Sequence, residues 1–131
     1  MTWLLDTNVL IDAARGWPAP VRRRLSTVSP DDVAISAVSA AELWYGALKA
    51  QDPKEKRALW TRVLEPYTVL PFDRAAAERH AELRHGLKQR PIGERDLFIA
   101  AIAAANDLTL VTRNTAEFSR VPGLAVEDWS V

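Results

Sequence analysis

Short apolar runs alternate with longer amphipathic segments along the whole chain. The apolar and β-branched runs predict strands at residues 2–5, 33–36, 67–72 and 109–112, with an edge strand at 124–126. Apolar residues at helical spacing predict helices at 7–14, 21–28, 39–50, 53–64, 73–89 and 94–105, and a short helical loop at 113–118. Strands that alternate with helices indicate an α/β fold, a three-layer α/β/α domain around a mainly parallel sheet of four to five strands.

The composition agrees with one compact domain and limits the kinds of site that the chain can build. At 131 residues and 48% hydrophobic, we expect a single domain over residues 1–131, with no room for a second. The absence of cysteine excludes disulfides and thiolate zinc sites. We see neither a secretion signal nor the ~18 consecutive apolar residues of a membrane span, so we expect a cytoplasmic protein without membrane association.

Three acidic residues stand where a parallel sheet would bring them together. Asp6 ends the first apolar run, Glu42 lies near the start of an Ala/Leu-rich helix, and Asp96 lies in the first turn of another helix. Ligands of open α/β sheets bind at the carboxyl ends of the strands, where we expect these acids to converge. Because clustered carboxylates are costly without a cation, and oxygen ligands suit hard ions, the pattern indicates Mg²⁺ or Mn²⁺.

Each acid also has a purely structural interpretation. Asp6 can cap the following helix, Asp96 gains from the helix dipole, and Ser39 with Glu42 has the spacing of a capping box. Three separate capping roles do not explain why the acids fall at positions that converge.

Four segments of the chain resemble the successive motifs of PIN-domain ribonucleases, most closely the VapC toxin family. They are LLDTNVLI at 4–11, SAAEL at 39–43 with Gly46, PIGERDLFIAA at 91–101, and LVTRN at 110–114 followed by Glu117 and Phe118. The resemblance covers essentially the whole chain in the family's order. It implies a PIN-like domain with endoribonuclease activity, the toxin of a type II toxin-antitoxin system, cleaving RNA phosphodiesters with metal-activated water.

The resemblance also implies cofactor, partners and site residues. The cofactor is Mg²⁺, with Mn²⁺ able to substitute, and the partners are RNA, a VapB-type antitoxin and a second copy of the chain. The antitoxin is expected in an apolar groove around Trp44, Tyr45, Leu59 and Trp60. The implied catalytic residues are Asp6, Glu42, Asp96 and Glu117, of which the first three hold metal, with Asn8, Thr112 and Asn114 in support. Asn114 is an alternative to Glu117 at the fourth position.

Basic residues near the acids are candidates for binding the RNA backbone. With 17 basic and 17 acidic residues the formal net charge is zero, so only local basic groups can attract RNA. The candidates are Arg22, Arg23, Arg24, Arg95 and Arg113.

Two other classes of function remain open. An aspartate-nucleophile phosphatase also places Asp6 after the first strand, but it needs a second acid where this chain has Asn8. A non-catalytic RNA- or protein-binding module, in which the acids serve as caps, predicts no metal-dependent activity. The sequence does not identify the RNA.

Overall fold

The protein folds around a five-stranded parallel sheet, seen in a computed structural model that describes residues 1–131. The strands are β1 (Trp3–Leu5), β2 (Val33–Ser36), β3 (Thr68–Leu70), β4 (Thr109–Val111) and β5 (Val126–Glu127). Their spatial order is β3-β2-β1-β4-β5, and every neighbouring pair is parallel. The predicted α/β class and parallel sheet are confirmed.

Seven α-helices and one short 3₁₀-helix connect these strands. The α-helices are α1 (Thr7–Arg15), α2 (Ala19–Ser26), α3 (Ala37–Leu48), α4 (Pro53–Leu64), α5 (Arg74–Gly86), α6 (Glu94–Ala105) and α7 (Thr115–Phe118). The 3₁₀-helix η1 (Pro30–Asp32) occupies the turn before β2. None of the helices is long and apolar enough to span a membrane.

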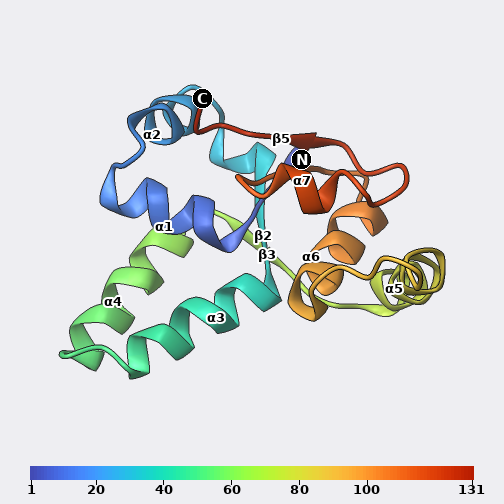
Figure 1. Cartoon of the computed structure of the whole chain (residues 1–131). Coiled ribbons are helices and arrows are strands. Elements are labelled where there is room, and N and C mark those ends of the chain that lie inside the picture. Colours follow the sequence, from blue (N-terminus) through green and yellow to red (C-terminus); the bar gives the residue numbers. More distant parts are fainter.

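The pleat of the strands sends successive apolar residues to two separate cores. Leu4 packs with α5, α6 and α7, whereas Leu5, its neighbour, packs with residues of α1 to α4. The same alternation separates Leu110 from Val111 on β4. Figure 1 shows the result: α1 to α4 lie on one side of the strands, and α5 to α7 lie on the other. The predicted three-layer architecture is therefore confirmed.

Several element boundaries differ from the sequence prediction. Strand β3 ends at Leu70, because Pro71 has no amide hydrogen to continue the ladder. The edge strand lies at Val126–Glu127, because pairing with Leu110 and Val111 sets its position. Helix α5 ends at Gly86 and α3 at Leu48, both earlier than predicted.

The start of α3 overturns the capping-box interpretation of Glu42. Ser36 is the N-cap, and its hydroxyl oxygen accepts a hydrogen bond from the Ser39 amide at 3.0 Å. Glu42 therefore lies in the second turn of α3, beyond the reach of a capping box, and its carboxylate has other partners.

The chain order of the strands reverses between β1 and β4, which are neighbours at the centre of the sheet. Such a switch point leaves a crevice at the carboxyl ends of the two strands, because their connections leave in opposite directions. Asp6 directly follows β1, and Thr112 directly follows β4. The fold thus places the first predicted site residue at the position where an α/β sheet binds ligands.

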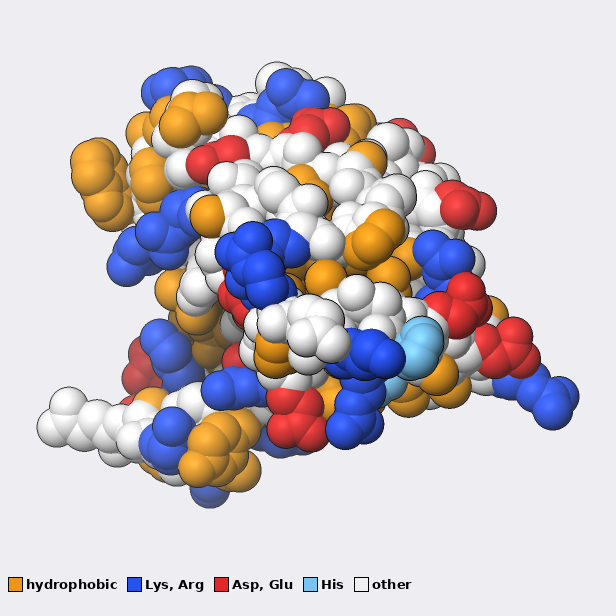
Figure 2. Space-filling model, turned by 45° about the vertical axis from the view of Figure 1, so that its right-hand side comes forward, with side chains coloured by type: hydrophobic (Ala, Val, Ile, Leu, Met, Phe, Trp, Pro, Cys, Tyr) orange, Lys and Arg blue, Asp and Glu red, His pale blue; other side chains and the backbone are white.

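Acidic and basic side chains are interspersed over the face that Figure 2 shows, in keeping with the zero net charge. No broad field of one sign lies on this face. Charge-specific binding must therefore depend on local groups.

Candidate active site

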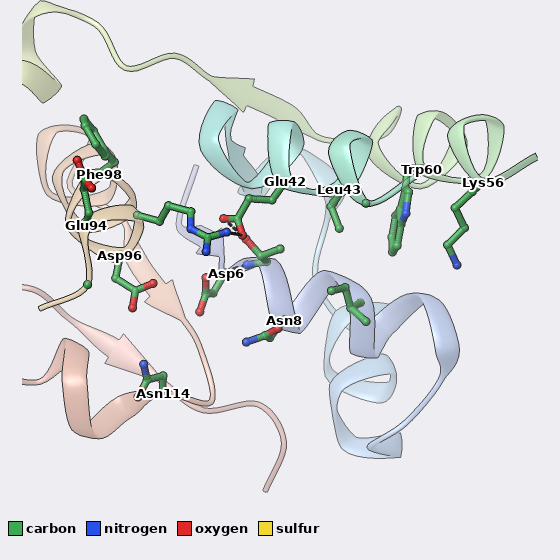
Figure 3. A pocket seen from close by; sticks show the side chains of 15 residues that line it. Asp6, Asn8, Glu42, Leu43, Lys56, Trp60, Glu94, Asp96, Phe98 and Asn114 are labelled. Carbon is green, nitrogen blue, oxygen red and sulfur yellow. Dashed lines mark hydrogen bonds and ion pairs between the residues drawn. The ribbon is translucent and has the colours of Figure 1, made fainter. Parts of the chain in front are cut away.

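A cleft of about 860 Å³ opens at the switch point. Its walls come from α1, α3, α4, the start of α6 and the segment after β4. Asp6, Asn8, Glu42, Asp96 and Asn114 all line it, as the sequence predicted. Figure 3 shows the carboxylates of Asp6 and Asp96 directed into the same space from different elements. The convergence of the three predicted acids is therefore a feature of the structure.

Asp6 is both a helix cap and a site residue. One carboxylate oxygen accepts a hydrogen bond from the Thr7 amide, and the other accepts one from the Thr112 hydroxyl, each at 2.8 Å. The residue is only 6% exposed, and burial raises the pKa of its carboxyl above the ordinary value. The Thr112 bond opposes that rise, so Thr112 supports the ionised form of Asp6.

Glu42 reaches the cleft from α3 and carries an ion pair across it. Its carboxylate lies 2.8 Å from the Arg95 guanidinium and accepts a second hydrogen bond from the Thr7 hydroxyl at 3.3 Å. The Thr7 hydroxyl oxygen also lies 2.8 Å from the Ser39 hydroxyl oxygen, a contact that joins the starts of α1 and α3. A basic side chain of the protein itself thus neutralises one of the clustered acids.

Asp96 and Glu117 form the most strongly perturbed pair. Burial, then Glu117 and the charges of Asp6 and Glu42, raise the pKa of Asp96 to about 7. The Glu117 carboxylate accepts hydrogen bonds from the Gly93 amide and from the Asn114 side chain, both at 2.6 Å. The Gly93 bond is the largest cause that lowers the pKa of Glu117. Asp96 therefore keeps a proton near neutral pH while Glu117 stays ionised.

Glu117 and Asn114, the two candidates for the fourth position, are hydrogen-bonded to each other. Asn114 lines the cleft, and Glu117 accepts hydrogen bonds from Asn114 and Gly93. Which of the two serves as the fourth site residue stays a prediction. The Gly93 amide had no sequence signal beyond its place in the loop before α6.

The acids fit a divalent cation of the Mg²⁺ type. Negative charges surround both aspartates: Glu42 and Glu117 raise the pKa of Asp6, and Glu117, Asp6 and Glu42 raise that of Asp96. No three carboxylates lie close enough together to share one ion directly. That arrangement suits Mg²⁺, which keeps several water ligands and binds proteins through one or two carboxylates. All donors are oxygens, as this ion prefers.

The five arginines predicted to bind RNA occupy different environments. Arg95 lines the cleft, but the other four do not. The Arg22 guanidinium donates to the Ala13 and Ala14 carbonyls at the end of α1. Arg24 lies over the Trp129 ring, 5.2 Å from its centre. Arg113 pairs with Asp12, a buried residue of α1 that the sequence analysis passed over.

The cleft extends away from the acids into a more apolar arm. Ile11, Leu43 and Gly46 line this arm, together with Lys56 and Trp60 of α4. Figure 3 shows Leu43, Trp60 and Lys56 on the side of the cleft away from Asp96. Among the residues expected to border the antitoxin groove, Trp60 is only 5% exposed, whereas Tyr45 is 63% exposed, so the groove itself stays a prediction. The Trp60 ring packs inside the core beneath α3 and α4.

The chain is similar to a known protein family and to proteins with known names. Residues 3–124 match the family model of the PIN domain. The chain is 39% identical to a tRNA(fMet)-specific endonuclease VapC of Shigella flexneri, over 99% of both chains. It is 33% identical to a ribonuclease VapC2 of Rickettsia felis, over 98% of both chains.

Solved structures agree in fold over the same length. The chain superposes on a chain of the DNA-bound VapBC of Salmonella typhimurium with a TM-score of 0.92, at 34% identity over 98% of both chains. It superposes on a chain of VapBC-1 from nontypeable Haemophilus influenzae with a TM-score of 0.90, at 29% identity over the full length of both chains. The chain belongs to the PIN-domain family and, within it, to the VapC ribonucleases.

Proposed function

We propose that this protein is a Mg²⁺-dependent endoribonuclease, with Mn²⁺ as a possible substitute, acting as the toxin of a type II toxin-antitoxin system in the cytoplasm. The observation that carries this proposal is the convergence of Asp6, Glu42 and Asp96, from three separate elements, on one cleft at the sheet's switch point. Membership of the VapC ribonucleases supports the reaction class. The raised pKa of Asp6 and of Asp96 supports the need for a cation.

The residues of the cleft have distinct roles in this proposal. Asp6 and Asp96 would hold the ion, and Glu42 would act on it through water. When bound, Mg²⁺ supplies the positive charge that offsets charge developing on the phosphate and makes a water easier to deprotonate. Thr112 orients Asp6, and Asn114 orients Glu117. Arg95, exposed at the cleft and held to Glu42 by one ion pair, can reach a phosphate without rearranging the fold.

Partner and substrate follow from the relatives. Structures of related VapBC complexes support a VapB-type antitoxin as the partner that inhibits this chain. We also propose that the free toxin is a homodimer. The name of the Shigella relative makes tRNA(fMet) the first RNA to test.

The direct test incubates the purified protein with end-labelled tRNA(fMet), an elongator tRNA and an unstructured RNA. Each RNA is tested with Mg²⁺, with Mn²⁺ and with EDTA. We expect internal cleavage with either ion and none with EDTA, and the labelled ends identify the bond. Cleavage that persists in EDTA would refute the metal-dependent mechanism. RNA binding without cleavage under any ion would favour the non-catalytic module. Release of phosphate from phosphomonoesters, without internal cleavage, would favour the phosphatase.

A further inference from the structure

Asp12 is a fully buried carboxylate whose two partners come from different parts of the chain. Its side chain is 0% exposed, on the second turn of α1. One oxygen lies 2.9 Å from the Arg15 guanidinium, a local contact within α1. The other lies 2.8 Å from Nε of Arg113, in the segment between β4 and α7. A buried carboxylate is costly without such partners, so these contacts have a structural reason to be kept.

The oxygen that faces Arg113 has no other partner. The Nε contact is an ion pair without the alignment of a hydrogen bond, and no other group donates to this oxygen. Arg113 therefore supplies its only counter-charge. The Arg113 side chain is 44% exposed, so replacing it leaves no cavity in the core.

Arg113 stands between the two residues that hold acids of the site. Thr112 donates its hydroxyl to Asp6 at 2.8 Å and accepts the Asn114 amide at 3.0 Å. Asn114 donates its side-chain amide to Glu117 at 2.6 Å. The segment 112–114 thus contacts α1 at two places, Asp6 at the helix start and Asp12 about 9 Å further along the axis. The Thr112 amide also donates to the Glu127 carbonyl at 2.9 Å, which holds the backbone where β4 ends. The Asp12 contact adds an attachment at Arg113, the residue between Thr112 and Asn114.

We propose that the Asp12–Arg113 ion pair is a positioning device that holds residues 112–114 against α1, so that Thr112 orients Asp6 and Asn114 orients Glu117. The inference rests on the proposed ribonuclease function and deepens it. It gives Arg113 a role within the protein in place of a contact with RNA. Removing a partner of this kind typically lowers metal affinity or activity about 10- to 100-fold.

The test compares Arg113→Met with Arg113→Lys and with the control Arg15→Met. Both methionine variants remove one guanidinium from the same carboxylate, but only Arg113 is attached to the site segment. In single-turnover cleavage with Mg²⁺, we expect Arg113→Met to lower the rate constant about 10- to 100-fold. The RNA concentration that gives half of the maximal rate constant should change little. Arg113→Lys should recover part of the loss. Arg15→Met should lower the melting temperature but keep the rate within about twofold of wild type.

A second readout does not depend on activity. Amide hydrogen exchange of Asn114 and Gly93, both donors in this network, is measured by NMR in the metal-free protein. We expect faster exchange at both amides in Arg113→Met and no change in Arg15→Met. Because exchange needs no substrate, it still decides the positioning role if the wild-type protein cleaves no RNA and the proposed function fails.

Three results would overturn the inference. If Arg113→Met raises half-saturating RNA and leaves the rate constant unchanged, Arg113 binds substrate. If Arg15→Met and Arg113→Met lower the rate equally, the ion pairs only stabilise the fold. If the exchange of Asn114 and Gly93 in Arg113→Met equals that of wild type, the segment does not depend on the pair. As a further check, the double variant Asp12→Asn/Arg113→Met should cleave RNA almost as fast as Asp12→Asn alone.

Discussion

Asp96→Asn should stabilise the metal-free protein while abolishing cleavage. Asp96 has an ordinary carboxyl pKa of 3.8, and the folded protein raises it to about 7, first through burial and then through Glu117. At pH 8 the native state must ionise this group beside other acids. An asparagine keeps the size of the side chain and, like the protonated acid, can donate a hydrogen bond to Glu117. The variant therefore removes repulsion and also removes a carboxylate that we propose as a metal ligand.

The stability gain expected for Asp96→Asn follows from the pKa shift of Asp96. A pKa raised from 3.8 to about 7 corresponds to about 4 kcal/mol for a fully buried group. Asp96 is only half-buried, so solvent screening reduces the expected gain to about 1–2 kcal/mol. For a domain of this size, that gain corresponds to a rise of about 3–8 °C in melting temperature.

The pH dependence has a definite sign. The unfolded chain releases the Asp96 proton near pH 4, whereas the native state keeps it up to about pH 7. Between these values the native state binds more protons, so the wild-type stability contributed by this group falls as pH rises through the window. Below about pH 4 both states are protonated, and the advantage of Asp96→Asn should disappear. Mg²⁺ should stabilise the wild type at pH 8 and have little effect on the variant.

Thermal unfolding in EDTA from pH 4 to 8, repeated with Mg²⁺, measures these effects, and cleavage of labelled RNA measures activity. Asp31→Asn, which changes an exposed acid outside the cleft, is the matched control and should show neither effect. An Asp96→Asn protein that is less stable than wild type at pH 8 in EDTA would refute the charge-repulsion argument. A variant that still cleaves RNA would refute the metal role.

Four other substitutions separate structural roles from functional ones. Thr112→Val removes the hydroxyl that donates to Asp6, and we expect it to lower the free energy of unfolding by about 1–3 kcal/mol. Mn²⁺ affinity measured by calorimetry should be about 10- to 100-fold weaker, and an unchanged affinity would contradict the role of Thr112. Ser36→Ala removes the N-cap of α3 and should lower the free energy of unfolding by about 1 kcal/mol in denaturant titrations. Glu42→Gln should abolish cleavage without that loss of stability. A Glu42→Gln protein that loses stability but still cleaves RNA would instead support the capping-box interpretation of Glu42. Arg95→Ala should change the free energy of unfolding by less than about 0.5 kcal/mol. In filter-binding titrations it should weaken RNA binding and reduce the slope of log affinity against log salt concentration by about one. An unchanged slope would exclude a contact between Arg95 and a phosphate.

The parts of this structure that depend on local pattern were predictable. Apolar runs and helical spacing predicted every strand and the parallel sheet, because those signals repeat along each element. The convergence of Asp6, Glu42 and Asp96 was predictable too, since each stands at an element end that a parallel sheet directs to one edge. Only the start of α3 misled the interpretation of an acid, because Ser36 ends a strand and caps a helix at once.

The parts that depend on long-range packing were not predictable. Nothing in the local sequence pairs Arg95 with Glu42, or Arg113 with Asp12, because these contacts exist only after distant elements have packed. Asp12 reads as an ordinary polar residue of an amphipathic helix, yet it is fully buried. Arg113 reads as a candidate for RNA binding for the same reason, since its partner lies far away in the chain. Side-chain pairing across elements is therefore where the structure adds most to the sequence.

A Mg²⁺ titration of single-turnover RNA cleavage shows directly whether the acids at the switch point make cleavage depend on a divalent cation. Wild type, Asp6→Asn and the exposed control Asp31→Asn are compared, each shown to be folded by circular dichroism. We expect saturable activation by Mg²⁺ for wild type and Asp31→Asn, and no activation for Asp6→Asn at any Mg²⁺ concentration. Cleavage by folded Asp6→Asn with the wild-type Mg²⁺ dependence would contradict this expectation.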